Sequence, residues 1–151
     1  MLLALDIGNS NIVIGASKNG NWRHQWRIQT DTDKTADEYV VLFNSLFSEE
    51  DLTFSKFDQI IISSVVPQLT QTISEMFRMK SHTEALILNG EVDTGLAIKR
   101  VSRKSVGADL IADAVGAYSV FEDDCIVVDF GTATTVMVVQ NPGELIGGSI
   151  C

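Results

Sequence analysis

The fold is decided by residues 126–135, which read IVVDFGTATT. An apolar run ends in Asp129, and a glycine with small hydroxyl-bearing residues separates it from a second apolar run at 136–139. This pattern predicts two strands joined by a tight turn. Because the first run is apolar at nearly every position, we expect a strand that is covered on both faces.

The turn of this hairpin carries groups that suit a phosphate. Gly131 allows close approach of a ligand to the backbone, the turn amides attract oxyanions, and Asp129 can hold an accompanying cation. The same Asp-Phe-Gly sequence occurs in protein kinases. No glycine-rich loop, Val-Ala-Ile-Lys or His-Arg-Asp sequence accompanies it here, so that kinase class is rejected.

The N-terminus repeats the pattern. An apolar run at 2–5 is followed by Asp6 and Gly8, then by small polar residues at 9–11 and a second apolar run at 12–14. An acid and a glycine at the end of one strand are usually only turn formers. Two copies, each opening a new run of strands, indicate a duplicated domain with a phosphate site between its halves.

Composition narrows the class of protein. The chain has 151 residues, 45% hydrophobic and 21% charged, which suits an ordinary globular domain. Its net charge of −9 disfavours nucleic acid as a partner. The first apolar run is short and interrupted by Asp6, so we expect neither a signal peptide nor a membrane span. Cys125 and Cys151 are expected to be free thiols in a reducing cytoplasm.

Hydrophobic periodicity and turn signals predict the elements between the two hairpins. Strands are expected at 2–7, 11–17, 22–29, 59–66, 85–88, 126–139 (as the hairpin) and 144–151, and helices at 36–48, from Pro67 onward and at about 105–120. Thr35 and Glu38 form a capping box before the first helix. Asn19-Gly20 is a hairpin signal between the strands at 11–17 and 22–29. The segment 90–105 is the least regular part.

A cluster of cations lies in that irregular segment, namely Lys99, Arg100, Arg103 and Lys104. Such a cluster is most often a solvated loop. It could also steer an anion towards a site.

Three stretches in this order resemble the type III pantothenate kinases: residues 6–11 (DIGNSN), 107–110 (GADL) and 129–135 (DFGTATT). The order of elements resembles the wider superfamily of acetate and sugar kinases, heat-shock chaperones and actin. The resemblance implies an α/β fold. Residues 1–120 would form an actin-like ATPase (ribonuclease H-like) domain with a mixed β-sheet flanked by helices. Residues 121–151 would be the first strands of a duplicated second domain.

The resemblance also implies an activity, namely ATP-dependent phosphorylation of pantothenate to 4'-phosphopantothenate, the first step of coenzyme A biosynthesis. Asp109 would be the catalytic residue that accepts the hydroxyl proton, and Gly107 to Leu110 would bind pantothenate. Asp129 and Asp6 would hold metal ions, namely Mg²⁺ and a monovalent cation such as K⁺ or NH₄⁺. The nucleotide would be bound by Asp6, Ile7, Gly8, Asn9, Ser10, Asn11, Gly131 and Thr132. A cytoplasmic homodimer is expected.

Two departures from the family pattern stand out. The family usually has arginine where this chain has Leu110, and a leucine cannot offer a carboxylate a forked, charged partner. Arg100, Arg103 or Lys104 could substitute for it. The sequence also stops where family members continue, so we expect an incomplete second half and little turnover from this chain alone. The alternative is a catalytically inactive relative that acts as a nucleotide-binding or regulatory module.

Overall fold

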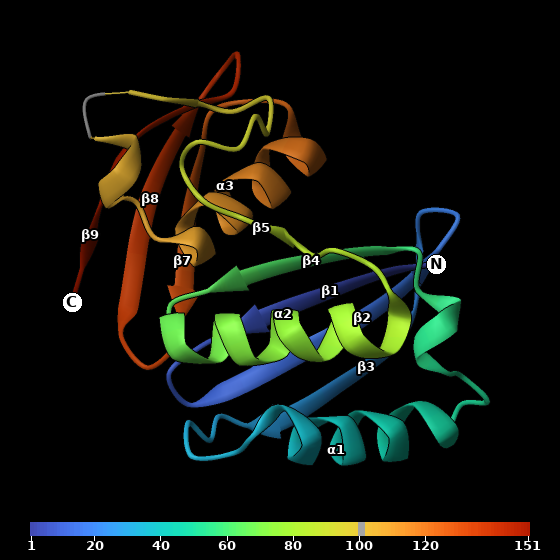
Figure 1. Cartoon of the computed structure of the whole chain (residues 1–151). Coiled ribbons are helices and arrows are strands. Elements are labelled where there is room, and N and C mark those ends of the chain that lie inside the picture. Colours follow the sequence, from blue (N-terminus) through green and yellow to red (C-terminus); the bar gives the residue numbers. More distant parts are fainter. Residues whose placement is uncertain (100–101) are drawn as a thin grey trace. The chain divides into compact units, whose positions relative to one another are not determined.

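A computed structural model describes residues 1–99 and 102–151, without the side chain of Lys104. The chain divides into two compact units, Met1–Ile87 and Leu88–Cys151, which are described separately below (Figure 1). Among the described residues, no helix is both long enough and apolar enough to cross a membrane.

Unit 1 contains a five-stranded mixed sheet of order β3-β2-β1-β4-β5. Its elements are β1 (Leu2–Ile7), β2 (Asn11–Lys18), β3 (Asn21–Gln29), α1 (Ala36–Ser48), the 3-10 turn η1 (Phe54–Lys56), β4 (Gln59–Ser64), α2 (Pro67–Ser81) and β5 (Leu86–Ile87). β1, β2 and β3 pair antiparallel, whereas β4 runs parallel to both β1 and β5. Consequently β1 is central, with the first hairpin on one side and the parallel strands on the other.

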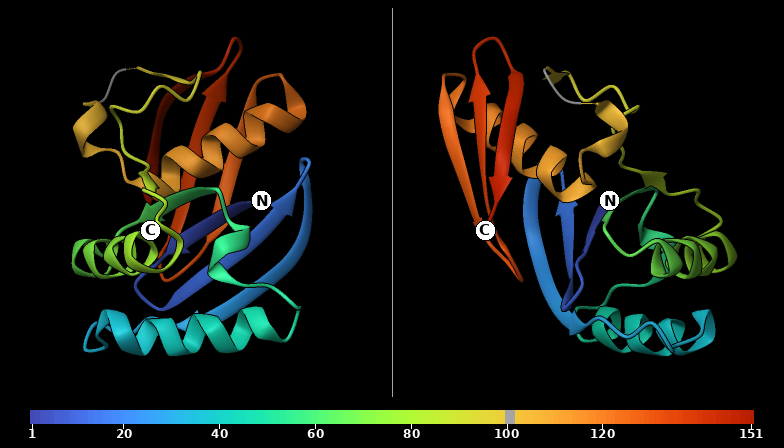
Figure 2. Two further views of the ribbon diagram at one scale, coloured as in Figure 1. Left: turned by 45° about the vertical axis from the view of Figure 1, so that its right-hand side comes forward. Right: turned by 90° about the vertical axis from the view of Figure 1, so that its left-hand side faces the viewer.

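The core of unit 1 lies between one face of this sheet and the helices α1 and α2, which cover it together (Figure 2). Leu3, Leu5 and Ile7 of β1 alternate towards that core and are at most 2% exposed. From α1, Phe43 packs its ring 5.6 Å from those of Phe47 and Phe77, measured between centroids. The expected helical stripe of α1 is therefore core.

Local signals in unit 1 are confirmed. The capping box is present, with the Thr35 N–H donating to the Glu38 carboxylate at 2.8 Å. Hydrogen bonds from the Thr35 N–H and hydroxyl lower the pKa of Glu38. Pro67 occupies the first turn of α2, and Asn19 and Gly20 adopt the positive φ angles that an Asn-Gly hairpin turn requires.

Unit 2 contains a four-stranded sheet of order β6-β9-β8-β7, with α3 against one face (Figure 2). Its elements are β6 (Ala97–Ile98), the 3-10 turn η2 (Arg103–Ser105), α3 (Ala108–Phe121), β7 (Cys125–Phe130), β8 (Thr134–Gln140) and β9 (Glu144–Ile150). β7, β8 and β9 pair antiparallel, and β6 runs parallel to β9. The predicted hairpin at 126–139 is thus confirmed, whereas β6 falls in the segment expected to be irregular.

The expectation that the first strand of this hairpin is covered on both faces is wrong. Val127 packs against the core of unit 2 beneath α3, but Ile126, Val128 and Phe130 on the other face of β7 are 70%, 46% and 83% exposed. A continuous apolar run shows that both faces of a strand are apolar, but it does not show which segment of the chain covers each face. The proposed domain boundary near residue 120 stays a prediction, although the compact units divide at Ile87 and Leu88.

Replacing Phe43 with alanine removes a fully buried ring from the aromatic cluster of unit 1. We expect the free energy of unfolding to fall by about 3–5 kcal/mol, because the cavity cannot close completely. Urea denaturation monitored by circular dichroism measures the change. Val41→Ala on the same helix is the control, since Val41 is 69% exposed and should cost less than about 0.5 kcal/mol. Equal losses in the two variants would contradict the proposed core position.

Candidate functional site

The turn between β1 and β2 is closed by its own backbone. The Gly8 N–H donates to the Asn11 carbonyl at 3.0 Å, and a Cβ at position 8 would lie 3.3 Å from that oxygen. Asn9, Ser10 and Asn11 are exposed. This turn therefore presents small polar side chains and backbone to solvent, as a phosphate-binding turn must.

Asp6 lies at the carboxyl end of β1, on the face of the sheet away from α1 and α2. This placement follows because its neighbours Leu5 and Ile7 point into the core. The Asp6 side chain is exposed, and its Oδ1 accepts a hydrogen bond from the Ser63 hydroxyl of β4 at 3.2 Å. Ligands of open α/β sheets bind at the carboxyl ends of parallel strands, which is where this acid lies.

Thr30 supports the first turn, although the sequence analysis did not single it out. Its N–H donates to the Ser10 carbonyl at 3.0 Å, and its hydroxyl donates to the Gly8 carbonyl at 2.6 Å. The pairing of Asn11 with Gln29 brings residue 30 to this turn. The sequence analysis predicted the two strands but not this register, so it did not identify Thr30.

The loop that follows Thr30 is tied to α1. The Tyr39 hydroxyl donates to the Asp31 carbonyl at 2.8 Å, and burial raises the pKa of Tyr39. Lys34 pairs with the Asp31 carboxylate. The hydrogen bond from Lys34 lowers the pKa of Asp31, and the same bond raises the pKa of Lys34. The loop that begins with Thr30 is thereby held against α1.

The second turn, between β7 and β8, has a similar construction. The Gly131 N–H donates to the Ala133 carbonyl at 3.1 Å, and the exposed Asp129 precedes the glycine by two residues. A Cβ at position 131 would lie 3.2 Å from Asp129 Oδ2, so glycine leaves room for the carboxylate. Thr132 is exposed at the tip of the turn.

The third candidate group lies at the start of α3. Gly107 is the N-cap residue, and its carbonyl accepts the Ile111 N–H at 3.2 Å. The Asp109 Oδ1 accepts the N–H of Leu110 at 2.8 Å. A Cβ on residue 107 would overlap that carboxylate oxygen, so the glycine again makes room for an acid. A carboxylate in the first turn is also favoured by the helix dipole.

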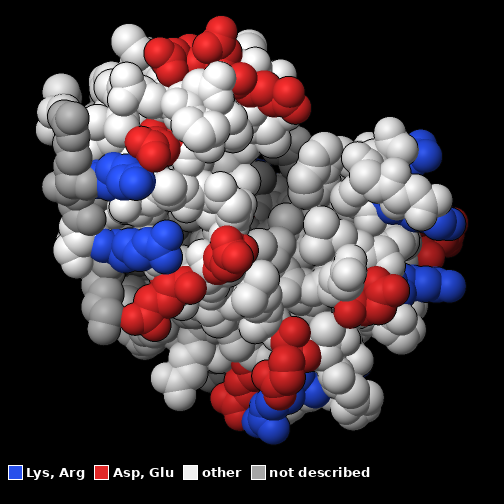
Figure 3. All heavy atoms as spheres, turned by 90° about the horizontal axis from the view of Figure 1, so that it is seen from above, with Lys and Arg blue, Asp and Glu red and all other residues white. Residues whose placement is uncertain are grey.

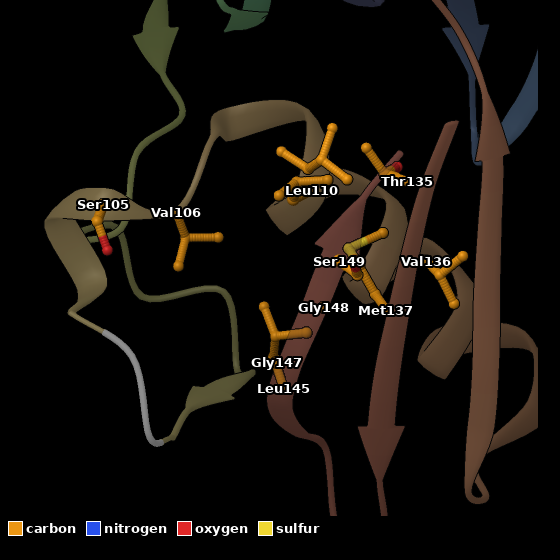
Figure 4. Close-up of a pocket in the computed structure, with 11 residues that line it drawn as sticks. Ser105, Val106, Leu110, Thr135, Val136, Met137, Leu145, Gly147, Gly148 and Ser149 are labelled. Atoms are coloured by element: carbon orange, nitrogen blue, oxygen red, sulfur yellow. The ribbon is translucent and has the colours of Figure 1, made fainter. Parts of the chain in front are cut away.

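A pocket of about 170 Å³ lies within unit 2, between the start of α3, the loop before it, and strands β8 and β9 (Figure 4). Its apolar walls include Val106, Leu110, Met137 and Leu145. Leu110 is one of the residues predicted to bind substrate. The pocket therefore joins the 107–110 segment to the strand that follows the second turn.

Thr135 is the polar residue of this pocket that stands out, because it is only 8% exposed. Its Oγ1 is buried and has no hydrogen-bond partner among the described residues. An unpaired buried hydroxyl costs about 1–3 kcal/mol, so such groups call for an explanation. The sequence marked Thr135 only as the end of the 129–135 motif.

The two acid-tipped turns belong to different units, so a shared phosphate site stays a prediction. No group of three or more His, Cys, Asp or Glu side chains able to hold a metal occurs in the described part of the chain. Metal binding by Asp6 and by Asp129 stays a prediction.

The cationic segment is only partly described. Lys99 forms an ion pair with Glu144 at 3.4 Å, and Arg103 is exposed in η2. Arg100 and the side chain of Lys104 lie outside the described residues. Arg103 is not among the residues that line the pocket, and its substitution for the family's arginine stays a prediction.

Solved structures share this fold. A protein assigned as a 2-dehydro-3-deoxygalactonokinase from Sinorhizobium meliloti matches with a TM-score of 0.56 and 10% identity, over 99% of this chain and 53% of its own. A protein assigned as an N-acetylglucosamine kinase from Porphyromonas gingivalis matches with a TM-score of 0.52 and 12% identity, over 99% of this chain and 47% of its own. YeaZ from Pseudomonas aeruginosa matches with a TM-score of 0.50 and 12% identity, over 99% of this chain and 66% of its own. This chain therefore spans about half to two thirds of these proteins.

These matches confirm the expected actin-like ATPase fold, and at such low identity they show the fold alone. Evidence for a family comes from the sequence itself. The profile described as type III pantothenate kinase matches residues 2–151. The chain belongs to the type III pantothenate kinase family.

Proposed function

We propose that the protein is a kinase that transfers the terminal phosphate of ATP to the primary hydroxyl of pantothenate, giving 4'-phosphopantothenate for coenzyme A biosynthesis. The observation that carries this proposal is the placement of Asp109. Its carboxylate lies in the space that Gly107 leaves at the start of α3, and its neighbour Leu110 lines a pocket in a chain of this family.

Asp109 is proposed to accept the proton of the attacking hydroxyl. A carboxylate is a weak base, but in a loose phosphoryl-transfer transition state the proton leaves late, and orientation matters more than basicity. The hydrogen bond from the Leu110 N–H fixes one carboxylate oxygen. The other oxygen remains available as an acceptor, because an ionised carboxylate accepts on both oxygens.

The two acid-tipped turns are proposed to bind the nucleotide, with Asp6 to Asn11 on one side and Gly131 and Thr132 on the other. Bare carboxylates would repel the phosphates, so cations must lie between them. We propose Mg²⁺ and a monovalent cation, K⁺ or NH₄⁺, at Asp6 and Asp129. The ions would neutralise charge that develops on the transferred phosphoryl group.

A second candidate function is a catalytically inactive relative that acts as a nucleotide-binding or regulatory module. Leu110 supports it, because an apolar side chain stands in the pocket wall at the position of the family's arginine. A chain of this kind would keep the nucleotide turns while its acceptor site changed. The phosphoryl-transfer experiment below separates the two candidates.

The partners proposed are small molecules and a second copy of the chain, in the cytoplasm. Two free cysteines suit a reducing compartment. We propose no nucleic-acid and no membrane partner. The net charge of −9 supports the first of these. On the face shown in Figure 3, the basic side chains also occur in small groups near acidic ones.

Asp109→Asn keeps the shape of the side chain and removes its capacity to accept a proton. We expect kcat for pantothenate phosphorylation to fall by about 10²–10⁴-fold, which is the usual contribution of a general base. The assay follows phosphopantothenate formation with ATP, Mg²⁺ and K⁺, using the protein expressed from its complete reading frame. Asp123→Asn, at an exposed acid just after α3, is the control. No product from the unmodified protein would reject the kinase and favour the inactive relative.

Gly107→Ala tests whether the position of the Asp109 carboxylate matters. The φ of −61° and ψ of 149° at Gly107 suit alanine, so the fold should persist while the carboxylate is displaced. We expect kcat/KM to fall by about 10²-fold, the size of effect that a small misplacement can cause. Gly116→Ala on the same helix is the control, because a Cβ there meets nothing within 4 Å. Equal activity of the two variants would show that this placement is unimportant.

Self-association should depend on the exposed face of β7. Ile126, Val128 and Phe130 form an apolar patch of the kind that normally finds a partner. We expect the chain to sediment as a dimer or larger species and Ile126→Asp to shift it towards monomer. Val120→Asp is the control, since Val120 is similarly exposed on α3. A clean monomer before any substitution would contradict the proposal.

A further inference from the structure

Thr30 makes two hydrogen bonds to the first turn, the one between β1 and β2. Its N–H donates to the Ser10 carbonyl at 3.0 Å, and its hydroxyl donates to the Gly8 carbonyl at 2.6 Å. The first bond continues the backbone pairing of β2 with β3. The second bond comes from a side chain and adds to that pairing. The Thr30 hydroxyl therefore acts on one particular peptide group, the one that links Gly8 to Asn9.

The bond from Thr30 fixes the direction of this peptide group. In a planar trans peptide, the C=O and the N–H point in opposite directions. Since the Gly8 carbonyl is directed at Thr30, the Asn9 N–H is directed away from it. Asn9 lies in an exposed turn, and oriented N–H groups of turns bind anions. Thr30 thus controls the orientation of a group of the kind that binds a phosphate oxygen.

The residues of the turn do not select this orientation by themselves. Glycine tolerates most backbone angles, and asparagine enters the left-handed region more readily than other residues with a side chain. A half-turn of the Gly8–Asn9 peptide changes mainly the ψ of the first residue and the φ of the second, which this pair tolerates. The rotated peptide would present its carbonyl oxygen to a phosphate, and oxygens of like partial charge repel each other.

The segment that carries Thr30 is itself fixed to two helices. The Asp31 carbonyl accepts the hydroxyl of Tyr39 in α1 at 2.8 Å, and Tyr39 is fully buried. The Thr32 carbonyl accepts Nε2 of Gln68 in α2 at 3.3 Å. Both helices pack on the core of unit 1. Thr30 therefore offers the turn a hydrogen-bond donor whose position the core determines.

We propose that Thr30 is a positioning residue for nucleotide binding. Its hydroxyl holds the Gly8–Asn9 peptide in the orientation that directs the Asn9 N–H towards a phosphate oxygen of ATP. This role, which rests on the proposed function, adds to the nucleotide site at residues 6–11 a residue outside that turn. Thr30 acts through the peptide group and not by touching the nucleotide.

Thr30→Val keeps the branched shape of the side chain and removes its hydroxyl. We expect the KM for ATP and the Kd for Mg²⁺-ATP to rise by about tenfold, the size of effect that one lost hydrogen bond can cause, while the KM for pantothenate stays unchanged. Thr30→Ser keeps a hydroxyl and should restore both values. Steady-state kinetics and titration calorimetry with Mg²⁺-ATP measure these changes, using the protein expressed from its complete reading frame.

Thr83→Val is the matched control, because Thr83 is also half-buried and its hydroxyl also donates to a distant carbonyl. That acceptor is the Phe57 carbonyl, at 3.3 Å. It precedes β4, which runs parallel to β1, so this bond lies at the amino end of the two strands, whereas the first turn follows the carboxyl end of β1. Thr83→Val should leave the KM for ATP unchanged. An equal rise in Thr83→Val and Thr30→Val, or failure of Thr30→Ser to restore binding, would overturn the proposal.

Phosphoryl transfer and nucleotide binding together separate the two proposals. Phosphorylation of pantothenate with an equal KM for ATP in the unmodified protein and Thr30→Val would overturn the role of Thr30 while supporting the kinase. Absence of phosphorylation, with Mg²⁺-ATP binding that weakens in Thr30→Val and returns in Thr30→Ser, would reject the kinase while supporting the role of Thr30. Absence of Mg²⁺-ATP binding by the unmodified protein would overturn both.

Discussion

The alternation of side chains along β1 is the constraint on which the candidate site depends. Leu3, Leu5 and Ile7 are buried under α1 and α2, so Asp6 between them must face the other side of the sheet. A slip of one residue would bury the carboxylate and expose three aliphatic side chains, which fixes the register firmly. Parallel pairing with β4 then places Ser63 opposite Asp6. The position of the acid is thus a consequence of how its neighbours are buried.

Side chains alternate along β7 as they do along β1, and this similarity underlies the repeated hairpin pattern seen in the sequence. When Asp129 is aligned with Asp6, the residues Ile126, Val128 and Phe130 take the places of Leu3, Leu5 and Ile7. In unit 1 that face lies under two helices, whereas in unit 2 it is exposed and α3 packs on the other face. The two hairpins therefore share a local design while differing in what covers them. In each unit, the acid therefore lies on the opposite face of the sheet from these three apolar side chains.

Much of the fold could be predicted because its signals are local. The capping box fixed the start of α1 at Ala36, and the Asn-Gly turn fixed the hairpin before β3. Strand β6 was missed because two residues paired to a distant strand carry no periodicity of their own. Among site residues, Asp109 came from a resemblance, and Thr30 and Thr135 needed tertiary contacts. Hydrogen bonds between distant segments, or their absence, cannot be read from a pattern of apolar residues.

Two positions at the start of α3, Gly107 and Leu110, meet different physical requirements. Gly107 acts through what it lacks, since any Cβ there would compete with the Asp109 carboxylate for space. That requirement is geometric, because it follows from the space that the carboxylate occupies. Leu110 instead contributes apolar surface to the pocket wall. A side-chain substitution at residue 110 therefore changes the pocket wall and keeps the backbone N–H that donates to Asp109 Oδ1.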